Sequence, residues 1–158
     1  MLHLKEGDKA PDIKAEDQFG NTISLNDYLG NKVILFFYPK DNTPGCSAEA
    51  CNLRDNYQEL TEKGFKLIGV SADDINLHQS FTEKFSLPFS LIPDTEKKII
   101  LNYGVWGEKK FMGKTYNGIH RLTFIINEKG SIEKIFTKVD TKNHTTQILK
   151  ELKLNQHN

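Results

Sequence analysis

Two cysteines are the residues of this sequence best suited to nucleophilic or redox chemistry. Cys46 and Cys51 are separated by four residues, and no other cysteine occurs in the 158-residue chain. Cys46 follows the loop of residues 39–45 and stands where a helix is predicted to start, near Ser47. A helix start presents unpaired N–H groups and the positive end of the helix dipole, which lower the pKa of a cysteine placed there. This position favours Cys46 as a thiolate nucleophile; a small hydrophobe filling a gap at the helix start is the equally common alternative.

The spacing of the two cysteines constrains any bond between them. In one regular helix their Cα atoms would lie about 8.6 Å apart, whereas a disulfide requires about 7 Å or less. A Cys46–Cys51 disulfide, if it forms, therefore requires the start of the helix to unwind. Gly45 and Ser47 are poor helix formers, which lowers the cost of unwinding. The spacing also differs from the C-x-x-C motif of dithiol oxidoreductases.

Composition excludes several classes of function. The 21 basic residues balance the 21 acidic ones, and no basic block interleaved with aromatic residues suggests nucleic-acid binding. The longest strongly apolar run, residues 33–38, is far shorter than the roughly 20 residues of a membrane span. The start of the chain lacks the apolar stretch of a secretory signal. These features predict one cytoplasmic domain over residues 1–158, with neither a nucleic-acid nor a membrane partner.

Hydrophobic periodicity predicts an alternating α/β chain. Hairpins are expected over residues 12–25 and 122–136, and helices over 47–63, from about 75 to 87, over 99–103 and around 148–152. Further strands are expected at 33–38, 66–71 and 89–92. The first is a continuous apolar run, as in a strand covered on both faces, and the second is interpreted as another buried strand. We interpret Leu77 as part of the buried face of the second helix, and Lys109 and Lys110 as a solvated loop. This order of elements predicts an α/β, thioredoxin-like fold, with a mixed sheet, helices on both faces and an N-terminal hairpin extension.

A specific segment of the chain resembles a known family. Residues 37–51 have the sequence FYPKDNTPGCSAEAC and resemble the active-site segment of peroxiredoxins, in particular the bacterioferritin-comigratory or PrxQ type. Pro39, Thr43 and Cys46 match the pattern P-x-x-x-T-x-x-C of that family. Residues 103–110 and Arg121 are also similar to this subgroup, and the likeness extends over nearly the whole chain.

The resemblance implies a catalytic cycle based on the two thiols. Cys46 would be the peroxidatic cysteine, which attacks a peroxide oxygen and becomes a sulfenic acid. Cys51 would resolve that acid as an intramolecular disulfide, and a thioredoxin-type protein would then reduce the disulfide. The implied substrates are hydrogen peroxide and organic hydroperoxides. The resemblance calls for no metal or organic cofactor, and we expect a monomer or a weak homodimer.

The resemblance also implies roles for four residues around Cys46. Thr43 would hydrogen-bond the thiolate and the peroxide, and Pro39 would shield the sulfur from water. Arg121, one of only two arginines, would stabilise the thiolate and the polarised O–O bond with its forked donors. Glu49 would orient this arginine through a charge-assisted pair. Without the resemblance, an ordinary turn is the favoured explanation of Thr43, and the end of a strand is that of Pro39. The helix dipole alone explains Glu49 at least as well as a functional role does.

Two other functions remain open at this point. A general thiol–disulfide oxidoreductase would exchange dithiols without consuming peroxide. A thioredoxin-fold binding module would need neither cysteine. Competing motifs are weaker, since the sequence contains neither a P-loop nor a dinucleotide-binding fingerprint. Trp106 is interpreted as a packing residue and His120 as a structural one.

Overall fold

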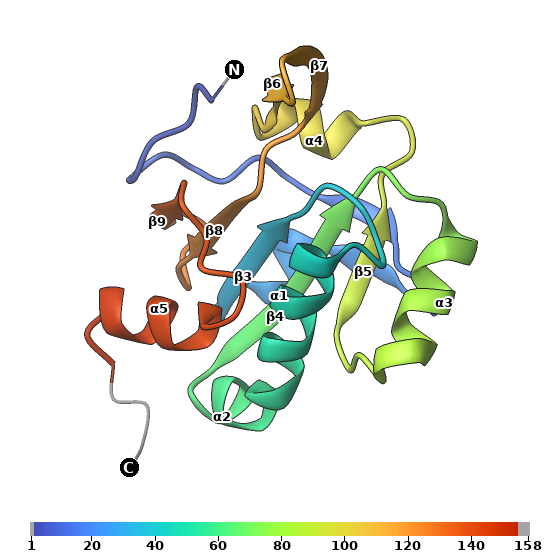
Figure 1. The fold of residues 1–158 in the computed structure, drawn as a ribbon. Helices are drawn as coiled ribbons and strands as arrows, with labels where there is room; N and C mark the ends of the chain where they lie inside the picture. The colour runs from blue at the N-terminus through green and yellow to red at the C-terminus, as the bar shows by residue number, and fades with distance from the viewer. Residues whose placement is uncertain (1, 155–158) are drawn as a thin grey trace.

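The computed structural model of the chain describes residues 2–154; Met1 and residues 155–158, the two ends of the predicted 1–158 domain, lie outside the described residues. A five-stranded sheet forms the centre (Figure 1). Its strands are, in spatial order, β5 (Ser90–Pro93), β4 (Phe65–Ser71), β3 (Lys32–Phe37), β8 (Leu122–Ile126) and β9 (Ile132–Phe136). The pairs β3–β4 and β4–β5 are parallel, while β3–β8 and β8–β9 are antiparallel. The predicted mixed sheet is therefore confirmed.

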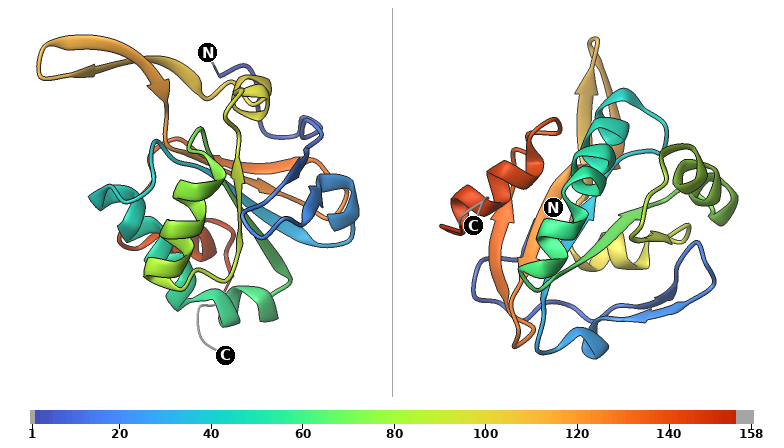
Figure 2. Two further views of the ribbon diagram at one scale, coloured as in Figure 1. Left: turned by 90° about the vertical axis from the view of Figure 1, so that its right-hand side faces the viewer. Right: turned by 90° about the horizontal axis from the view of Figure 1, so that it is seen from below.

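Alternation along β3 separates the core into two halves. Ile34 and Phe36 pack with residues of the helices α1 (Pro44–Asp55), α2 (Tyr57–Glu62), α3 (Ile75–Phe85) and α5 (His144–Glu151). Val33, Leu35 and Phe37 face the opposite side of the sheet. This side is covered by α4 (Lys98–Asn102) and by the N-terminal hairpin, whose strands are β1 (Lys14–Glu16) and β2 (Thr22–Ser24). The short 3-10 helix η1 (Leu25–Tyr28) follows this hairpin. Figure 2 shows α1, α3 and α5 on one side of the sheet and this hairpin on the other. Both the N-terminal hairpin and the placement of helices on both faces are confirmed.

The segment predicted as a solvated loop around Lys109 is instead a second hairpin. Its strands β6 (Trp106–Phe111) and β7 (Lys114–Ile119) pair antiparallel and extend away from the main body (Figure 2). Most side chains of the two strands are exposed, including Phe111, as is Met112 in the turn between them. Because neither face of the hairpin contributes a regular apolar stripe to the core, the alternation that identifies a strand is absent from the sequence.

The helix predicted over residues 47–63 is two helices, and it starts earlier. α1 begins at Pro44, and α2 follows after Asn56, whose backbone leaves the helical region with φ −109° and ψ 13°. The Asn56 side chain donates to the carbonyl of Asn52 at 2.8 Å. An asparagine that bonds the backbone in this way competes with the helical hydrogen bonds, which explains the break.

The helix predicted from about residue 75 to 87 is observed as α3 (Ile75–Phe85), but the prediction of which side chains it buries is wrong in one place. Asp74 caps its N-terminus by accepting from the backbone N–H of Leu77 at 2.9 Å. Leu77, predicted to be buried, is 43% exposed, whereas the neighbouring His78 is fully buried. His78 is buried because it bonds the loop that precedes α1, as described below.

Within residues 2–154, each helix is too short or too polar to span a bilayer.

Candidate active site

Cys46 is the third residue of α1 and is 2% exposed. Thr43 is the N-cap in an extended conformation, and Pro44 occupies the first helical position, where its missing N–H costs nothing. The first helical hydrogen bond runs from the N–H of Ser47 to the carbonyl of Thr43 at 2.8 Å. The sulfur therefore lies in the first turn, in the field of the helix dipole and near backbone N–H groups that have no intrahelical partner.

Sheet register brings Arg121 to this turn. Phe37, the last residue of β3, pairs with Leu122, the first residue of β8. Arg121 therefore lies at the end of β3 from which the chain runs into α1. Its Nη2 donates to the Sγ of Cys46 at 3.3 Å, across 75 positions of sequence.

The other branch of the same guanidinium group binds Glu49. Nη1 of Arg121 donates to Oε1 of Glu49 at 2.7 Å. Glu49 is one helical turn beyond Cys46 and is 1% exposed. Burial raises its pKa from 4.5 to about 7, because the opposing effect of Arg121 does not cancel the loss of solvation. One arginine thus contacts both a thiol and a buried carboxyl group.

Gly45 provides the space that the arginine occupies. A Cβ atom at this position would lie 3.1 Å from Nη2 of Arg121 and 3.8 Å from its Cζ. The absence of a side chain at residue 45 therefore allows the guanidinium group to approach the first turn of α1 and reach the sulfur.

A buried network holds the loop that leads into α1. The hydroxyl of Tyr38 donates to Oδ1 of Asp41 at 2.7 Å, and the backbone N–H of Asp41 donates to Asp73 at 2.8 Å. His78 contacts Oδ2 of Asp41 at 2.6 Å. Asp41 and His78 are both buried. The loop is therefore anchored to β4 and α3, which fixes where α1 begins.

The members of this network also have the spacing of a metal site. Ligand atoms of Asp41, Asp73 and His78 lie within 4.8 Å of one another. These side chains are already used in hydrogen bonds: Asp73 Oδ2 accepts from the Ser71 hydroxyl at 2.8 Å, and both ring nitrogens of His78 have partners, Nδ1 at Asp41 and Nε2 at the Ile92 carbonyl, 3.1 Å away. We interpret the group as the loop anchor rather than as a cation site.

Cys51 lies in the same helix as Cys46, and both thiols are free. Cys51 is partly exposed, unlike Cys46. The side chain of the next residue, Asn52, ties α1 to α5. Its Nδ2 donates to the Lys142 carbonyl at 2.9 Å, and its Oδ1 accepts from the backbone N–H of Thr145 at 2.8 Å. The helix is thus anchored immediately after Cys51.

The other two predicted site residues lie in the loop before α1. The Thr43 hydroxyl donates to the Lys40 carbonyl at 2.8 Å, so its one proton is used in that bond in this conformation. Pro39 is separated from the end of β3 by Tyr38 and is half-buried. The structure thus joins Cys46, Glu49 and Arg121 through hydrogen bonds, while the roles expected for Thr43 and Pro39 stay predictions.

Sequence reasoning missed two residues next to this site. His144, the first residue of α5, is fully buried, and its Nε2 lies 3.7 Å from Oε2 of Glu49. Lys109, on β6, donates to the Ile119 carbonyl at 2.8 Å. The pKa of Lys109 is lowered, chiefly by burial and also by Arg121, while Cys46 acts in the opposite direction. The ammonium group therefore interacts electrostatically with two residues of the site. His144 belongs to no motif identified in the sequence, and Lys109, although within the family-like segment 103–110, is interpreted from the sequence as part of a solvated loop.

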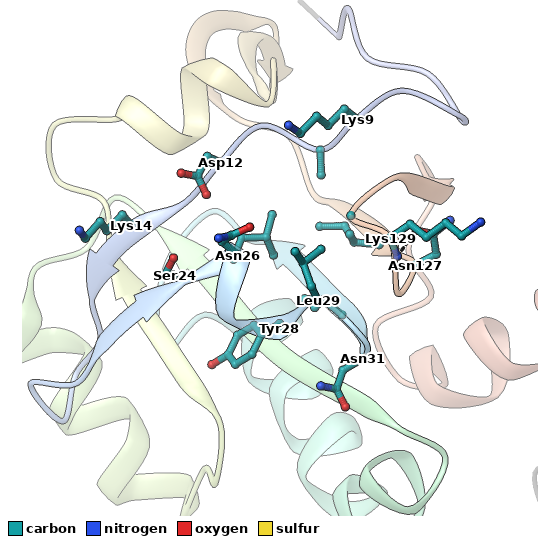
Figure 3. Close-up of a pocket in the computed structure, with 15 residues that line it drawn as sticks. Lys9, Asp12, Lys14, Ser24, Asn26, Tyr28, Leu29, Asn31, Asn127 and Lys129 are labelled. Atoms are coloured by element: carbon teal, nitrogen blue, oxygen red, sulfur yellow. Dashed lines mark hydrogen bonds between the residues drawn. The ribbon is translucent and has the colours of Figure 1, made fainter.

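Pockets occur both beside and away from this site. A pocket of about 400 Å³ beside Arg121 is also lined by Lys109 and His120 and by the apolar Leu2, Leu122 and Val139. His120 itself lies 3.0 Å from the Glu108 carbonyl, a structural contact. A larger pocket of about 540 Å³ lies at the opposite end of β3, between the N-terminal segment and the β8–β9 turn, and contains neither cysteine (Figure 3).

Comparisons with known proteins agree over nearly the full chain. Residues 6–135 match the AhpC/TSA family. Peroxiredoxin Bcp of Escherichia coli K12 is 45% identical over 153 residues, which cover 97% of this chain and 98% of that protein. Peroxiredoxin Bcp of Bacillus subtilis is 44% identical over 152 residues, which cover 96% of this chain and 97% of that protein.

Solved structures give the same result. A cysteine-to-serine mutant of Xylella fastidiosa PrxQ superposes with a TM-score of 0.89 at 28% identity, covering 97% of this chain and 98% of that one. The bacterioferritin comigratory protein of Xanthomonas campestris, described for its alkyl peroxide reduction activity, gives a TM-score of 0.82 at 30% identity, covering 89% of this chain and 90% of that one. The predicted thioredoxin-like architecture is that of these neighbours.

Proposed function

This chain belongs to the AhpC/TSA family and is a thiol-dependent peroxidase of the Bcp or PrxQ type, and on that premise we propose that Cys46 is its peroxidatic residue. The observation that carries the proposal is the hydrogen bond from Arg121 to the Cys46 sulfur at 3.3 Å. A fixed cation and a helix start acting on one thiol favour its negative form, which is the nucleophile.

In the proposed first step, the Cys46 thiolate attacks the terminal oxygen of a peroxide. The S–O bond forms as the O–O bond breaks, sulfur loses two electrons to the peroxide, and an alcohol or water leaves after gaining a proton. Negative charge moves from sulfur towards the leaving oxygen, and Arg121 is placed to stabilise it throughout. Thr43 would turn its hydroxyl towards the peroxide, and Pro39 would limit the access of water to the sulfur.

In the proposed second step, Cys51 attacks the sulfenic acid and releases water, giving a Cys46–Cys51 disulfide. Both residues lie in one helix, where the Cα separation of about 8.6 Å exceeds the reach of a disulfide. The first turns of α1 must therefore unwind, and the contacts of Asn52 with α5 set the far boundary of the unwound segment. A thioredoxin-type protein would then reduce the bond.

The proposed substrates are hydrogen peroxide and organic hydroperoxides. The pocket of about 400 Å³ beside Arg121 supports the second class, because its apolar side chains could contact an alkyl group. The cytoplasm is the proposed compartment, because reductants there return disulfides to thiols. We further propose a monomer or weak homodimer, with neither nucleic-acid nor membrane partners.

Peroxide consumption by two cysteine variants tests this function. Cys46→Ser is expected to abolish turnover. Cys51→Ser is expected to reduce a single equivalent of peroxide per chain. Thioredoxin should not restore turnover in this variant, because no Cys46–Cys51 disulfide can form. A general thiol–disulfide oxidoreductase would instead exchange dithiols while leaving peroxide untouched. Full peroxidase activity in Cys46→Ser would refute the assignment.

A further inference from the structure

Glu49 has one satisfied oxygen and one unsatisfied oxygen. Oε1 accepts from Arg121 at 2.7 Å, whereas Oε2 is buried with no hydrogen-bond partner among residues 2–154. The closest ionisable group on that side is His144, whose Nε2 lies 3.7 Å from Oε2. A buried carboxylate oxygen without a donor is costly, so this carboxyl group is in an unfavourable place for a full negative charge.

The hydrogen bonds of His144 show that it cannot supply the missing donor. Two other bonds fix the orientation of the Gln147 side-chain amide: its oxygen accepts from the N–H of Asp140, and its nitrogen donates to the Lys138 carbonyl. The atom of Gln147 that lies 2.9 Å from Nδ1 of His144 is this oxygen, so it must accept from Nδ1. Nδ1 therefore carries the proton of the neutral ring, and Nε2 accepts from the Thr123 hydroxyl at 2.9 Å. Burial lowers the pKa of His144 to about 4, which keeps the ring neutral.

Nε2 of His144 therefore has no hydrogen to donate to Oε2 of Glu49, and its lone pair is engaged by the Thr123 hydroxyl. An ionised Oε2 would lie 3.7 Å from this electron-rich nitrogen with its own negative charge, which is repulsive. A protonated Oε2 carries no full charge, so this repulsion is removed. The geometry on the α5 side therefore favours the carboxylic acid form of Glu49.

The charges around Glu49 lead to the same conclusion. Arg121 before β8 and His144 on α5 face the carboxyl group, and Cys46 on α1 binds the other branch of Arg121. Further out, Lys109 on β6 acts on Cys46 and Arg121, and Asp140 after β9 acts on His144. Arg121 is the cation in direct contact with both the sulfur and the carboxyl group. A thiolate and a carboxylate would share that single charge, and low solvation penalises the surplus negative charge.

We propose that Glu49 is protonated while Cys46 is a thiolate, and that Glu49 releases this proton when Cys46 is oxidised. The inference rests on the proposed function. The thiolate takes an OH group from the peroxide, sulfur is oxidised by two electrons as the O–O bond breaks, and an alkoxide or hydroxide is left. The sulfenic acid is neutral, so the charge of Arg121 is then available to Glu49 alone. Glu49 ionises, and its proton balances the one that the leaving oxygen takes up. Glu49 acts here through Arg121, as a positioning residue that also balances charge.

Infrared difference spectroscopy tests the proposal on the full chain carrying Cys51→Ser, which stops at the sulfenic acid. The reduced protein is treated with one equivalent of hydrogen peroxide at a pH close to the Glu49 pKa of about 7. Oxidation is expected to remove the C=O band of a protonated carboxyl group, a band that shifts in D₂O, and to add carboxylate bands. Glu49→Gln should lack this change. Glu59→Gln is the matched control, because Glu59 on α2 also has a buried oxygen without a partner among the described residues, and it should retain the change.

A proton count in weakly buffered solution provides the second readout. The ultraviolet absorbance of the thiolate gives the fraction of Cys46 that is ionised before peroxide is added. The Cys51→Ser protein should take up fewer protons than that fraction, because Glu49 supplies them. Adding Glu49→Gln should raise the uptake to one proton per thiolate oxidised. Full uptake without Glu49→Gln would overturn the proposal.

Mass spectrometry separates failure of this inference from failure of the proposed function. If Cys46 gains an oxygen while the carboxyl band persists, the proton role of Glu49 is wrong and the peroxidase mechanism stands. If Cys46 gains no oxygen, the peroxidatic assignment fails and this proposal fails with it. The protein that retains Glu49 gives a decisive result on its own even if Glu49→Gln folds poorly.

Discussion

The backbone of Gly45 lies against the guanidinium group of Arg121, so close that a methyl group on its Cα would be 3.1 Å from Nη2. This nitrogen is the one that donates to the Cys46 sulfur. A larger residue at position 45 would displace the guanidinium group of Arg121, so the bond from Arg121 to the Cys46 sulfur depends on the absence of a side chain at Gly45.

Gly45→Ala is expected to lower peroxidase activity without lowering stability. A displacement of Arg121 by a few tenths of an ångström would cost about tenfold in kcat/KM, given the loss of about 10²-fold that a 1 Å misplacement can cause. Alanine is a better helix former than glycine by up to about 1 kcal/mol, so thermal unfolding should occur at the same or a higher temperature. Steady-state kinetics with hydrogen peroxide and thermal melts measure the two effects.

A double-mutant cycle with Arg121→Lys shows whether this effect passes through the arginine. In the Arg121→Lys background, the added Gly45→Ala change should have little further effect. An equal loss in both backgrounds would contradict the proposed connection.

Arg121→Lys is expected to reduce kcat/KM for peroxide by about 10²-fold, the typical loss when one donor to the developing charge is removed. Lysine retains the positive charge but cannot bond the Cys46 sulfur and the Glu49 carboxyl group with two fixed branches. Arg54→Lys is the control, because Arg54 bonds Asp55 and the Phe85 carbonyl. Activity of Arg121→Lys close to that of Arg54→Lys would rule out the stabilising role.

Formation of the Cys46–Cys51 disulfide is expected to unwind the start of α1. Amide hydrogen exchange at residues 46–51 should become faster in the oxidised protein than in the reduced one. α3 (Ile75–Phe85) serves as an internal reference and should exchange equally in both states. Equal protection of residues 46–51 in both states would show that the bond forms without unwinding.

His144 and Glu49 are expected to give opposite pH dependences of stability. The pKa of His144 falls from 6.5 to about 4 on folding, so its contribution is present above pH 6.5 and is lost as the pH falls towards 4, by about 3 kcal/mol for a shift of this size. The pKa of Glu49 rises from 4.5 to about 7, so its contribution is present below pH 4.5 and is lost as the pH rises towards 7. Between about pH 4.5 and 6.5 the two contributions should largely offset each other.

Denaturant unfolding across this pH range separates the two groups. Relative to the parent protein, His144→Gln should lose stability as the pH rises, and Glu49→Gln should lose it as the pH falls. A His144→Gln profile parallel to that of the parent would show that His144 is not buried in the neutral form.

The parts of the fold that the sequence predicts well are those with regular apolar patterns. The strands β3, β4 and β8 are mostly apolar and almost fully buried, and the hairpin of β8 and β9 has a clear turn at residues 127–130. The hairpin of β6 and β7 lacks such a pattern because its side chains are mostly exposed. The break at Asn56 also escapes a periodicity argument, because it depends on one side chain bonding the backbone.

The candidate site likewise has features that neighbouring residues predict and features that depend on tertiary contacts. The chemistry of Cys46 follows from its place at a helix start, and the unwinding that Cys51 requires follows from helix geometry, so both can be read from neighbouring residues. The position of Arg121 depends on the pairing of Phe37 with Leu122, and that of His144 on the packing of α5 against α1. Helix dipoles and periodicity are local consequences of covalent spacing, which the order of residues fixes. The shared charge of Arg121 and the pKa of Glu49 depend on which distant groups meet and how much water they exclude, and only the folded chain decides this.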